Sequence, residues 1–242
     1  MGVTRAKWVN NQLTYYDGTT GETVEPCAPA YFFDDFLGPI NLDVWTDLEL
    51  NTAVTTAPAA SVFNCAMGAV NENAAAGLYG KDDKPWNIDK GFIFEARLAV
   101  TVAPANTAEI HIGVMNDSYG ANSQGVVLND EIAKVAFFTF CASLNARIYT
   151  DEGTAARKAN VDTGITVVAG VYHIYRIDFT NSASVKFYID GVNVAGGTTF
   201  VMNTVAALMV QPWITVYKKN DAGTNAAGAF NLDYVRLWQA TR

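Results

Sequence analysis

The stretch SASVKFYIDGVNVAG, residues 182–196, predicts a β-hairpin and with it the fold class. Apolar Val, Phe and Ile alternate with polar residues along 185–190, and a period of two places the apolar set on one face of a strand. Asp190-Gly191 is a favoured pair for a two-residue turn in which both residues have positive φ. We therefore expect Phe187 and Ile189 to be buried.

Much of the remaining chain repeats this pattern. Short runs rich in β-branched and aromatic residues are separated by turn residues, as in GFIFEARLAVTV, TAEIHIGVMND, GVYHIYRIDFT and FNLDYVRLWQA. No segment shows the sustained 3.6-residue period of a capped helix. Many short strands at regular spacing predict an all-β sandwich or barrel.

The first 30 residues are expected to form an N-terminal β-arm and connector, followed by a domain over 31–242. Three short strand candidates precede two prolines, which interrupt any ladder of backbone hydrogen bonds. The aromatic residues Trp8, Tyr15 and Tyr16 lie on this arm, and Trp and Tyr often dominate protein–protein binding. They are the predicted contacts to another protein.

Composition excludes several function classes. The net charge of −8 and pI near 4.7 argue against nucleic-acid binding and against attraction to anionic membranes. No apolar run approaches the roughly 20 residues of a membrane-spanning helix, and the first residues lack an apolar leader. Cys27, Cys65 and Cys141 form no CxxC pair, so we expect free, mostly buried thiols in a protein folded in a reducing cytoplasm.

Three stretches carry a resemblance to a known fold. YFFDDFLG (31–38) looks like the opening strand of concanavalin-A-like jelly rolls. GVYHIYRIDFTNSASVKFYIDGVNV (170–194) resembles paired strands of laminarinase-type glycoside hydrolases and laminin-G-like domains, and FNLDYVRLWQ (230–239) resembles their closing strand. The resemblance implies a two-sheet antiparallel jelly-roll sandwich with one concave sheet.

A second resemblance concerns the arm. LTYYDGTTGETV looks like short β-turn arms of tailed-bacteriophage virion proteins, and the order of the later strands is similar to concanavalin-like proteins of phage heads. It implies a non-enzymatic capsid decoration subunit on the virion exterior. Its expected partners are a major capsid protein, further copies of itself as a homo-oligomer, and surface glycans, with no cofactor.

One strand carries the residues in which hydrolase chemistry is expected. Laminarinase-type hydrolases place two glutamates and an aspartate on one face of a strand, and the best match here is AEIHIGVMND. Its polar face has Glu109, His111 and Gly113, with Met115 where a second carboxylate is expected. Retaining hydrolysis needs a carboxylate pair about 5–5.5 Å apart. Without that pair we expect no catalytic residue, and a solvated polar pair at Glu109 and His111.

Other candidate residues are isolated. Trp86, in the polar run DDKPWNID, is the predicted exposed aromatic, so it joins Glu109 and His111 as a possible glycan contact. Trp213 and Trp238 are expected in the core. Asp233 matches a calcium-binding aspartate of some jelly-roll hydrolases, but a hydrogen-bonded strand residue is the simpler interpretation.

His173 is expected to be a packed or edge histidine, and the spacing of the histidines and cysteines predicts no metal site. Two alternatives to the virion protein remain open. A carbohydrate-binding, host-adhesion module predicts accessible tryptophans on the concave sheet. A divergent glycoside hydrolase predicts a second acid near Glu109, for which Asp117 is a possible source.

Overall fold

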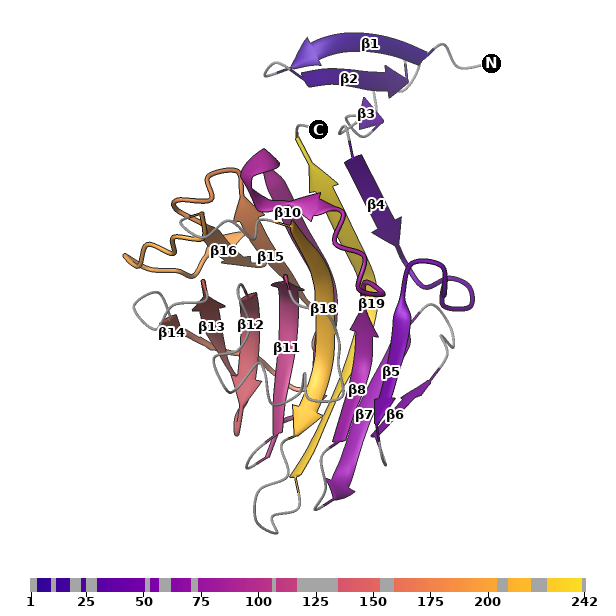
Figure 1. Ribbon diagram of the computed structural model, residues 1–242, viewed down its shortest axis with the longest axis vertical. Helices are drawn as coiled ribbons and strands as arrows, with labels where there is room; N and C mark the ends of the chain where they lie inside the picture. Colours follow the sequence, from indigo (N-terminus) through magenta and orange to yellow (C-terminus); the bar gives the residue numbers. More distant parts are fainter. Residues whose placement is uncertain are drawn as a thin grey trace.

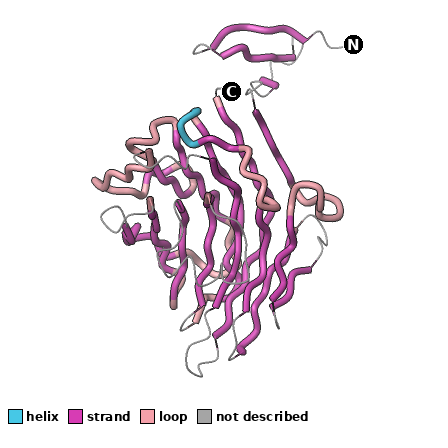
Figure 2. The backbone as a smooth tube through the Cα atoms, viewed as in Figure 1, coloured by secondary structure: helices cyan, strands magenta, loops and turns pink. Residues whose placement is uncertain are grey.

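The structure, a computed structural model, describes residues 4–9, 12–17, 23–24, 30–50, 53–56, 62–70, 74–105, 108–116, 135–152, 159–203, 209–218 and 226–240. Within them, two large antiparallel sheets pack face to face, and the helical structure is one 3-10 turn, η1 (Ile88–Lys90) (Figures 1 and 2). The predicted all-β, two-sheet sandwich is confirmed. None of the described residues forms a helix long and apolar enough to cross a membrane.

One sheet is named the β10 sheet after its middle strand. Its order is β17-β16-β15-β10-β19-β7-β6, and β4 also pairs with β19. The long strand β19 therefore pairs with β10 along one edge and with β7 and then β4 along the other. The strands are β4 (Ala30–Asp34), β6 (Ala53–Thr56), β7 (Phe63–Val70), β10 (Phe92–Val102), β15 (His173–Phe179), β16 (Lys186–Ile189), β17 (Val192–Asn193) and β19 (Ala226–Gln239).

The second sheet is named the β11 sheet. Its order is β14-β13-β12-β11-β18-β8-β5, and the short strand β9 pairs with one end of β18. The strands are β5 (Thr46–Leu50), β8 (Ala74–Tyr79), β9 (Trp86–Asn87), β11 (Ala108–Met115), β12 (Val135–Cys141), β13 (Asn145–Asp151), β14 (Ala159–Thr166) and β18 (Met209–Lys218).

The predicted hairpin is present as β16 and β17. Its turn residues Asp190 and Gly191 have φ of 50° and 78°, as a turn with two positive φ values requires. Phe187 is fully buried and Ile189 is 4% exposed, so the predicted face assignment is confirmed. Phe187 contacts Phe138 of the other sheet edge-to-face, with ring centroids 5.4 Å apart, so the hairpin helps to join the two layers.

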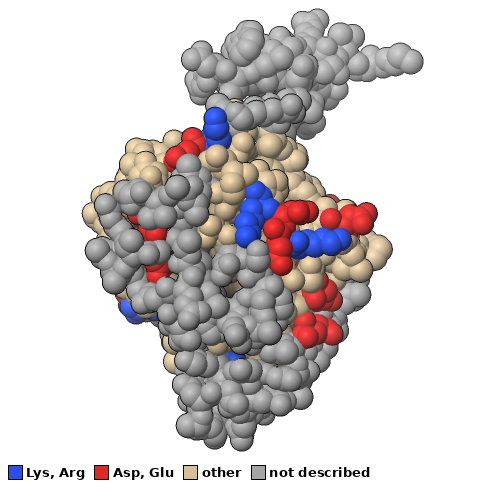
Figure 3. All heavy atoms as spheres, in the orientation of Figure 1, with Lys and Arg blue, Asp and Glu red and all other residues tan. Residues whose placement is uncertain are grey.

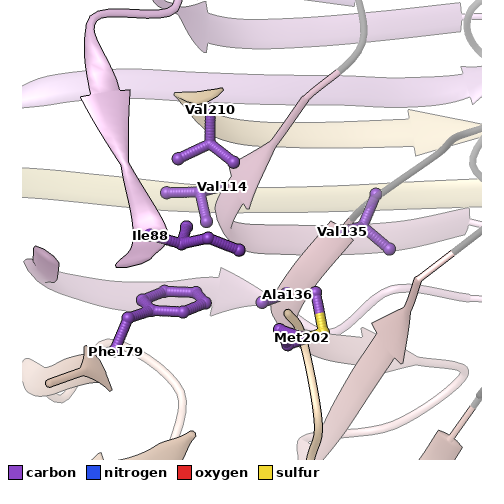
Figure 4. A pocket seen from close by; sticks show the side chains of 7 residues that line it. All are labelled: Ile88, Val114, Val135, Ala136, Phe179, Met202 and Val210. Atoms are coloured by element: carbon purple, nitrogen blue, oxygen red, sulfur yellow. The ribbon is translucent and has the colours of Figure 1, made fainter. Parts of the chain in front are cut away.

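The main core lies between the inner faces of the two sheets. From β11 it takes Ile110, Ile112 and Val114, which alternate with the residues of the outer face. At one end of this core, seven side chains leave too little space for a water molecule: Ile88, Val114, Val135, Ala136, Phe179, Met202 and Val210 (Figure 4). Such close packing is typical of protein interiors.

A small third sheet precedes the sandwich, in the order β1-β2-β3. Its strands are β1 (Thr4–Val9), β2 (Gln12–Asp17) and β3 (Thr23–Val24). Among the described residues it pairs with neither large sheet. The strands of the predicted arm are therefore present, and the domain boundary near residue 30 stays a prediction.

Candidate functional site

The candidate site is the outer face of the β11 sheet, the face that points away from the core. Residues directly opposite each other in antiparallel strands share a face, so the pairing register identifies its members. Glu109 lies between Tyr217 and Cys141, His111 between Thr215 and Thr139, and Gly113 between Trp213 and Phe137. The neighbouring strands add Tyr79, Arg147, Tyr149, Asn160 and Asp162.

Glu109 and His111 form a hydrogen-bonded pair on the middle strand of this face. Their Oε2 and Nε2 atoms are 2.8 Å apart, and the imidazole stacks on the Phe137 ring at a centroid distance of 5.2 Å. The His111 side chain is 1% exposed and that of Glu109 is 21% exposed. The predicted pair is present, but the expectation of a solvated pair is wrong for His111. Rings from the two neighbouring strands, Phe137 and Tyr217, pack against the imidazole.

Glu109 is the member of the pair that a ligand can reach, and its surroundings keep it ionised. Burial alone would raise the pKa of its carboxyl group. Hydrogen bonds from His111 and from the Cys141 thiol, together with the charge of His111, outweigh burial and hold that pKa below its usual range. The site therefore presents a carboxylate at neutral pH.

Cys141 is a neighbour of Glu109 that the sequence did not single out as part of a site. The cysteine is exposed, which corrects the expectation of mostly buried thiols, whereas Cys65 is buried as expected. Burial of the thiol group, the Glu109 charge and the hydrogen bond to Glu109 raise the Cys141 pKa. The thiol therefore stays protonated and donates to the carboxylate. Cys27 lies outside the described residues.

The position after His111 on this face has no room for a side chain. A Cβ atom built on Gly113 would lie 2.1 Å from the Ala136 carbonyl oxygen. A carboxylate on this strand at that position is therefore sterically excluded in this structure. The position at which a second carboxylate was expected is held by Met115, whose side chain is buried in the cluster that contains Trp213, Phe137 and Tyr217.

The other carboxylates of the described outer face are far from Glu109. Asp162 lies three strands away, which is about 14 Å at the usual spacing between strands. Asp151 lies opposite Val135, six residue pairs further along the sheet, or about 20 Å along the strands. Neither fits the roughly 5–9.5 Å between the paired carboxylates of glycosidases. Asp117 lies outside the described residues.

Aromatic side chains occupy the other half of this face. Trp213 and Tyr79 are in contact, with ring centroids 5.4 Å apart, and belong to a second hydrophobic cluster with Phe137 and Tyr217. Trp213 is 3% exposed, so its expected burial is confirmed, although it lies on the outer face instead of in the central core.

An exposed polar strip lies on the opposite side of Glu109, on β13 and β14. The Arg147 guanidinium donates to the Asn160 side-chain oxygen at 2.7 Å and lies 3.8 Å from an oxygen of Asp162. Asn145 donates to the same Asp162 oxygen at 2.8 Å. The strip was missed by sequence reasoning, because only the pairing of β13 with β14 brings these groups together. No three metal-ligating side chains cluster within the part of the chain that the structure describes.

Trp86 does not lie in an exposed loop. It is 7% exposed, because β9 pairs with β18 and the indole packs on Phe92 at a centroid distance of 5.5 Å. The predicted exposure is therefore wrong. Trp238 is only half-buried, which also differs from the expectation, and two arginines, Arg176 and Arg236, lie over its ring on the outer face of the β10 sheet.

The remaining predicted residues lie away from this face. His173 binds Asp190 of the hairpin turn, with Nδ1 and Oδ2 2.6 Å apart, which fits the expected edge histidine. Asp233 is paired with Arg97, in agreement with the simpler interpretation. Trp8 belongs to β1, opposite Leu13, and the tyrosines of the arm belong to β2. The side chains of Trp8, Tyr15 and Tyr16 lie outside the described part.

The sandwich is similar to solved glucanase structures. An endo-1,3-β-glucanase from Streptomyces sioyaensis superposes with a TM-score of 0.57 at 15% identity, over 90% of this chain and 99% of that one. A β-1,3-glucanase from Mycobacterium marinum gives 0.54 at 13% identity, over 86% and 97%. The pseudo β-1,3-glucanase of Mycobacterium tuberculosis gives 0.53 at 16% identity, over 86% and 98%. These identities establish the fold alone.

No protein-family profile matches the sequence, and no curated protein matches it. The comparisons correct the expected function. The fold is that of β-glucanases, and nothing in these similarities supports a bacteriophage capsid protein. The expectation of a non-enzymatic virion subunit is therefore wrong. The predicted homo-oligomer and the predicted location stay predictions.

Proposed function

We propose that this protein is a divergent glycoside hydrolase that binds a glycan across the outer face of the β11 sheet, with Glu109 as the reacting carboxylate. The observation that carries the proposal is the ionised, partly exposed Glu109 carboxylate on the middle strand of that face. The similarity of the fold to β-1,3-glucanases makes a β-glucan the first substrate class to test.

Glu109 suits the stabilisation of positive charge. Glycoside hydrolysis passes through a transition state that resembles an oxocarbenium ion, and a carboxylate beside the sugar ring can stabilise it or form a covalent intermediate. His111 holds the Glu109 side chain in one orientation and lowers its pKa, so that the carboxylate is charged at neutral pH. Because its imidazole is buried, His111 is a positioning residue and does not itself reach the substrate.

The exposed polar strip, two to three strands from Glu109, supplies groups that can bind the hydroxyls of further sugar units of the same glycan. Arg147, Asn160 and Asp162 offer donors and acceptors held in place by their mutual hydrogen bonds. Tyr149 lies between Phe137 and Asn160 and is half-buried, so it adds an aromatic edge. Such a mixture of fixed polar groups with apolar surface is common in ligand sites.

The described face supplies no second carboxylate near Glu109 that could protonate the leaving oxygen. Substrates whose leaving group needs no proton should therefore react fastest. We expect dinitrophenyl β-glucosides and β-laminaribiosides to be cleaved, and polymeric β-1,3-glucan to be cleaved more slowly.

The decisive test is to trap the intermediate. A 2-deoxy-2-fluoro-β-glucosyl fluoride should add one sugar to the peptide that contains Glu109, detected by mass spectrometry. Glu109→Gln should abolish labelling and lower turnover at least about a hundredfold. Asp190→Asn is the matched control, because it removes the other histidine-paired carboxylate, which lies in the hairpin turn of the β10 sheet, and this variant should still be labelled. Glycan binding without turnover or labelling would reject the hydrolase and leave the carbohydrate-binding alternative.

A further inference from the structure

A pocket lies at the rim between the two sheets, away from Glu109. It encloses about 230 Å³ and is lined by Phe32, Asp43, Val44, Gly80, Asp83, Pro85, Trp86, Pro212 and Leu237. Phe32 and Leu237 come from the β10 sheet, whereas Trp86 and Pro212 come from the β11 sheet. The other lining residues belong to the β4–β5 connection (residues 35–45) and the β8–β9 connection (residues 80–85). We propose that this pocket binds an organic ammonium ion carried on a hydrocarbon group the size of one six-membered ring.

The floor of the pocket is apolar and held in place. Phe32 packs edge-to-face on Trp45, whose indole N–H donates to Asp34 at 2.9 Å. On the other side, Trp86 packs on Phe92. The backbone N–H of Asn87 donates to the side-chain oxygen of Gln239 at 2.8 Å. A preformed apolar pocket binds a hydrocarbon ring without the cost of ordering its walls. An apolar cavity of about 150 Å³ accommodates benzene, so a six-membered ring fits here.

The rim selects for positive charge. Asp43 and Asp83 both line the pocket, and neither carboxylate makes a hydrogen bond or ion pair with another described residue. The two connections, residues 35–45 and 80–85, contain four aspartates and two lysines, which gives a net charge of −2. Acidic and basic groups alternate on the right of the molecule, where the β4–β5 connection lies (Figures 1 and 3).

One lysine near the rim already has a structural contact. The Lys81 ammonium donates to the Leu42 carbonyl oxygen at 3.0 Å, and this bond ties the two rim connections together. Asp82 is engaged by Gln211, which leaves Asp43 and Asp83 to face a ligand. Two carboxylates beside an apolar floor match an ammonium group on a hydrocarbon ring better than they match an anion or a polyol.

The backbone of these connections is strained. Among the described residues, the non-glycine positions with positive φ include Phe36, Lys81 and Asp82, all in the two rim connections. Such conformations cost free energy and tend to occur where surrounding structure or function requires them. These positive φ values indicate that the surrounding structure holds the two rim connections in a defined conformation.

The test compares ring-sized probes that differ in charge or polarity. Binding of cyclohexylamine, cyclohexanol, cyclohexanecarboxylate and glucosamine is measured by calorimetry, with tryptophan fluorescence as a second readout. We expect cyclohexylamine to bind most tightly, cyclohexanol more weakly, and the carboxylate and glucosamine weakest. The fluorescence change should disappear in Trp86→Phe. Equal affinity for cyclohexylamine and cyclohexanol would overturn the selection by charge, and equal affinity for glucosamine would overturn the apolar floor.

Two variants locate the site. Asp43→Asn combined with Asp83→Asn keeps the shape and should weaken cyclohexylamine binding about tenfold, as the loss of two exposed ion pairs implies, while cyclohexanol is unaffected. Asp35→Asn removes a carboxylate of the same connection that does not line the pocket, and should change nothing. An equal loss in Asp35→Asn would reject the site. Glu109→Gln should bind cyclohexylamine normally, so this proposal stands or fails separately from the proposed function.

Discussion

Two histidine–carboxylate pairs with similar geometry occupy contrasting places in this protein. His111 and Glu109 lie on one face of β11, with Nε2 and Oε2 2.8 Å apart. His173 and Asp190 join β15 to the hairpin turn, with Nδ1 and Oδ2 2.6 Å apart. The His111 side chain is 1% exposed and that of His173 is 19% exposed. The difference teaches that hydrogen-bond distance alone does not set the role of such a pair; the surrounding side chains do.

Asp190 serves the backbone as well as the histidine. One of its oxygens accepts the Ile174 N–H at 2.8 Å while the other binds His173, so the carboxylate fixes the end of the hairpin. Glu109 receives its hydrogen bonds from side chains, His111 and Cys141, on the outer face. One pair therefore holds a turn, and the other holds a carboxylate in position for a ligand.

The largest effect on the free energy of unfolding should come from a buried residue of the hairpin next to the His173–Asp190 pair. Phe187→Ala should lower the free energy of unfolding by roughly 3–5 kcal/mol, because it removes a fully buried ring between the sheets. Val192→Ala, at a position 64% exposed in the same hairpin, should change it by less than about 0.5 kcal/mol. Urea denaturation measures both. A loss below about 1 kcal/mol for Phe187→Ala would contradict the strand faces described here.

A smaller difference in the free energy of unfolding should separate alanine variants of the two histidines. His111→Ala removes a buried ring stacked on Phe137 and takes away one of the two hydrogen-bond partners of Glu109, so we expect a loss of about 2–3 kcal/mol. His173→Ala removes a partly exposed partner and should cost less than about 1 kcal/mol. The same denaturation series decides this. Equal losses would mean that the burial around His111 does not distinguish the pairs.

The smallest effects should appear in the pH dependence. Burial opposes ionisation of both Glu109 and Asp190, but hydrogen bonds from the histidines hold each pKa below its usual range. A lowered pKa stabilises the fold above the unfolded pKa, about 4.3 for Glu and 3.9 for Asp, and this contribution is lost as pH falls through the folded value. The stability advantage of wild type over Glu109→Gln and over Asp190→Asn should therefore shrink below about pH 4.

The stability contributions of the Asp190 and Glu109 carboxylates should differ in their dependence on salt. The effect of Asp190→Asn should weaken in 1 M NaCl, because its side chain is 50% exposed and exposed charges are screened. The effect of Glu109→Gln should change less. A stronger salt effect at Glu109 would contradict the burial that distinguishes the pairs.

Alternation in the sequence was sufficient to predict the strands, the hairpin turn and the buried face of β16, because these depend on neighbours along the chain. Burial that comes from other strands was not predictable in this way. Trp86 stands among polar residues, yet pairing of β9 with β18 buries it. The alternation along β11 places His111 on the face that was expected to be solvated, yet rings from β12 and β18 cover it. The polar strip required the pairing of β13 with β14, which nothing local specifies.

The strand order has a consequence for synthesis of the chain. β18 joins β11 to β8 in one sheet, and β19 joins β10 to β7 and β4 in the other. Both come after every other strand that the structure describes in chain order. Until residues 209–239 have left the ribosome, each sheet consists of two halves without the strand between them. Its pairing edges stay open during translation, so the sandwich is completed only after the last two strands emerge.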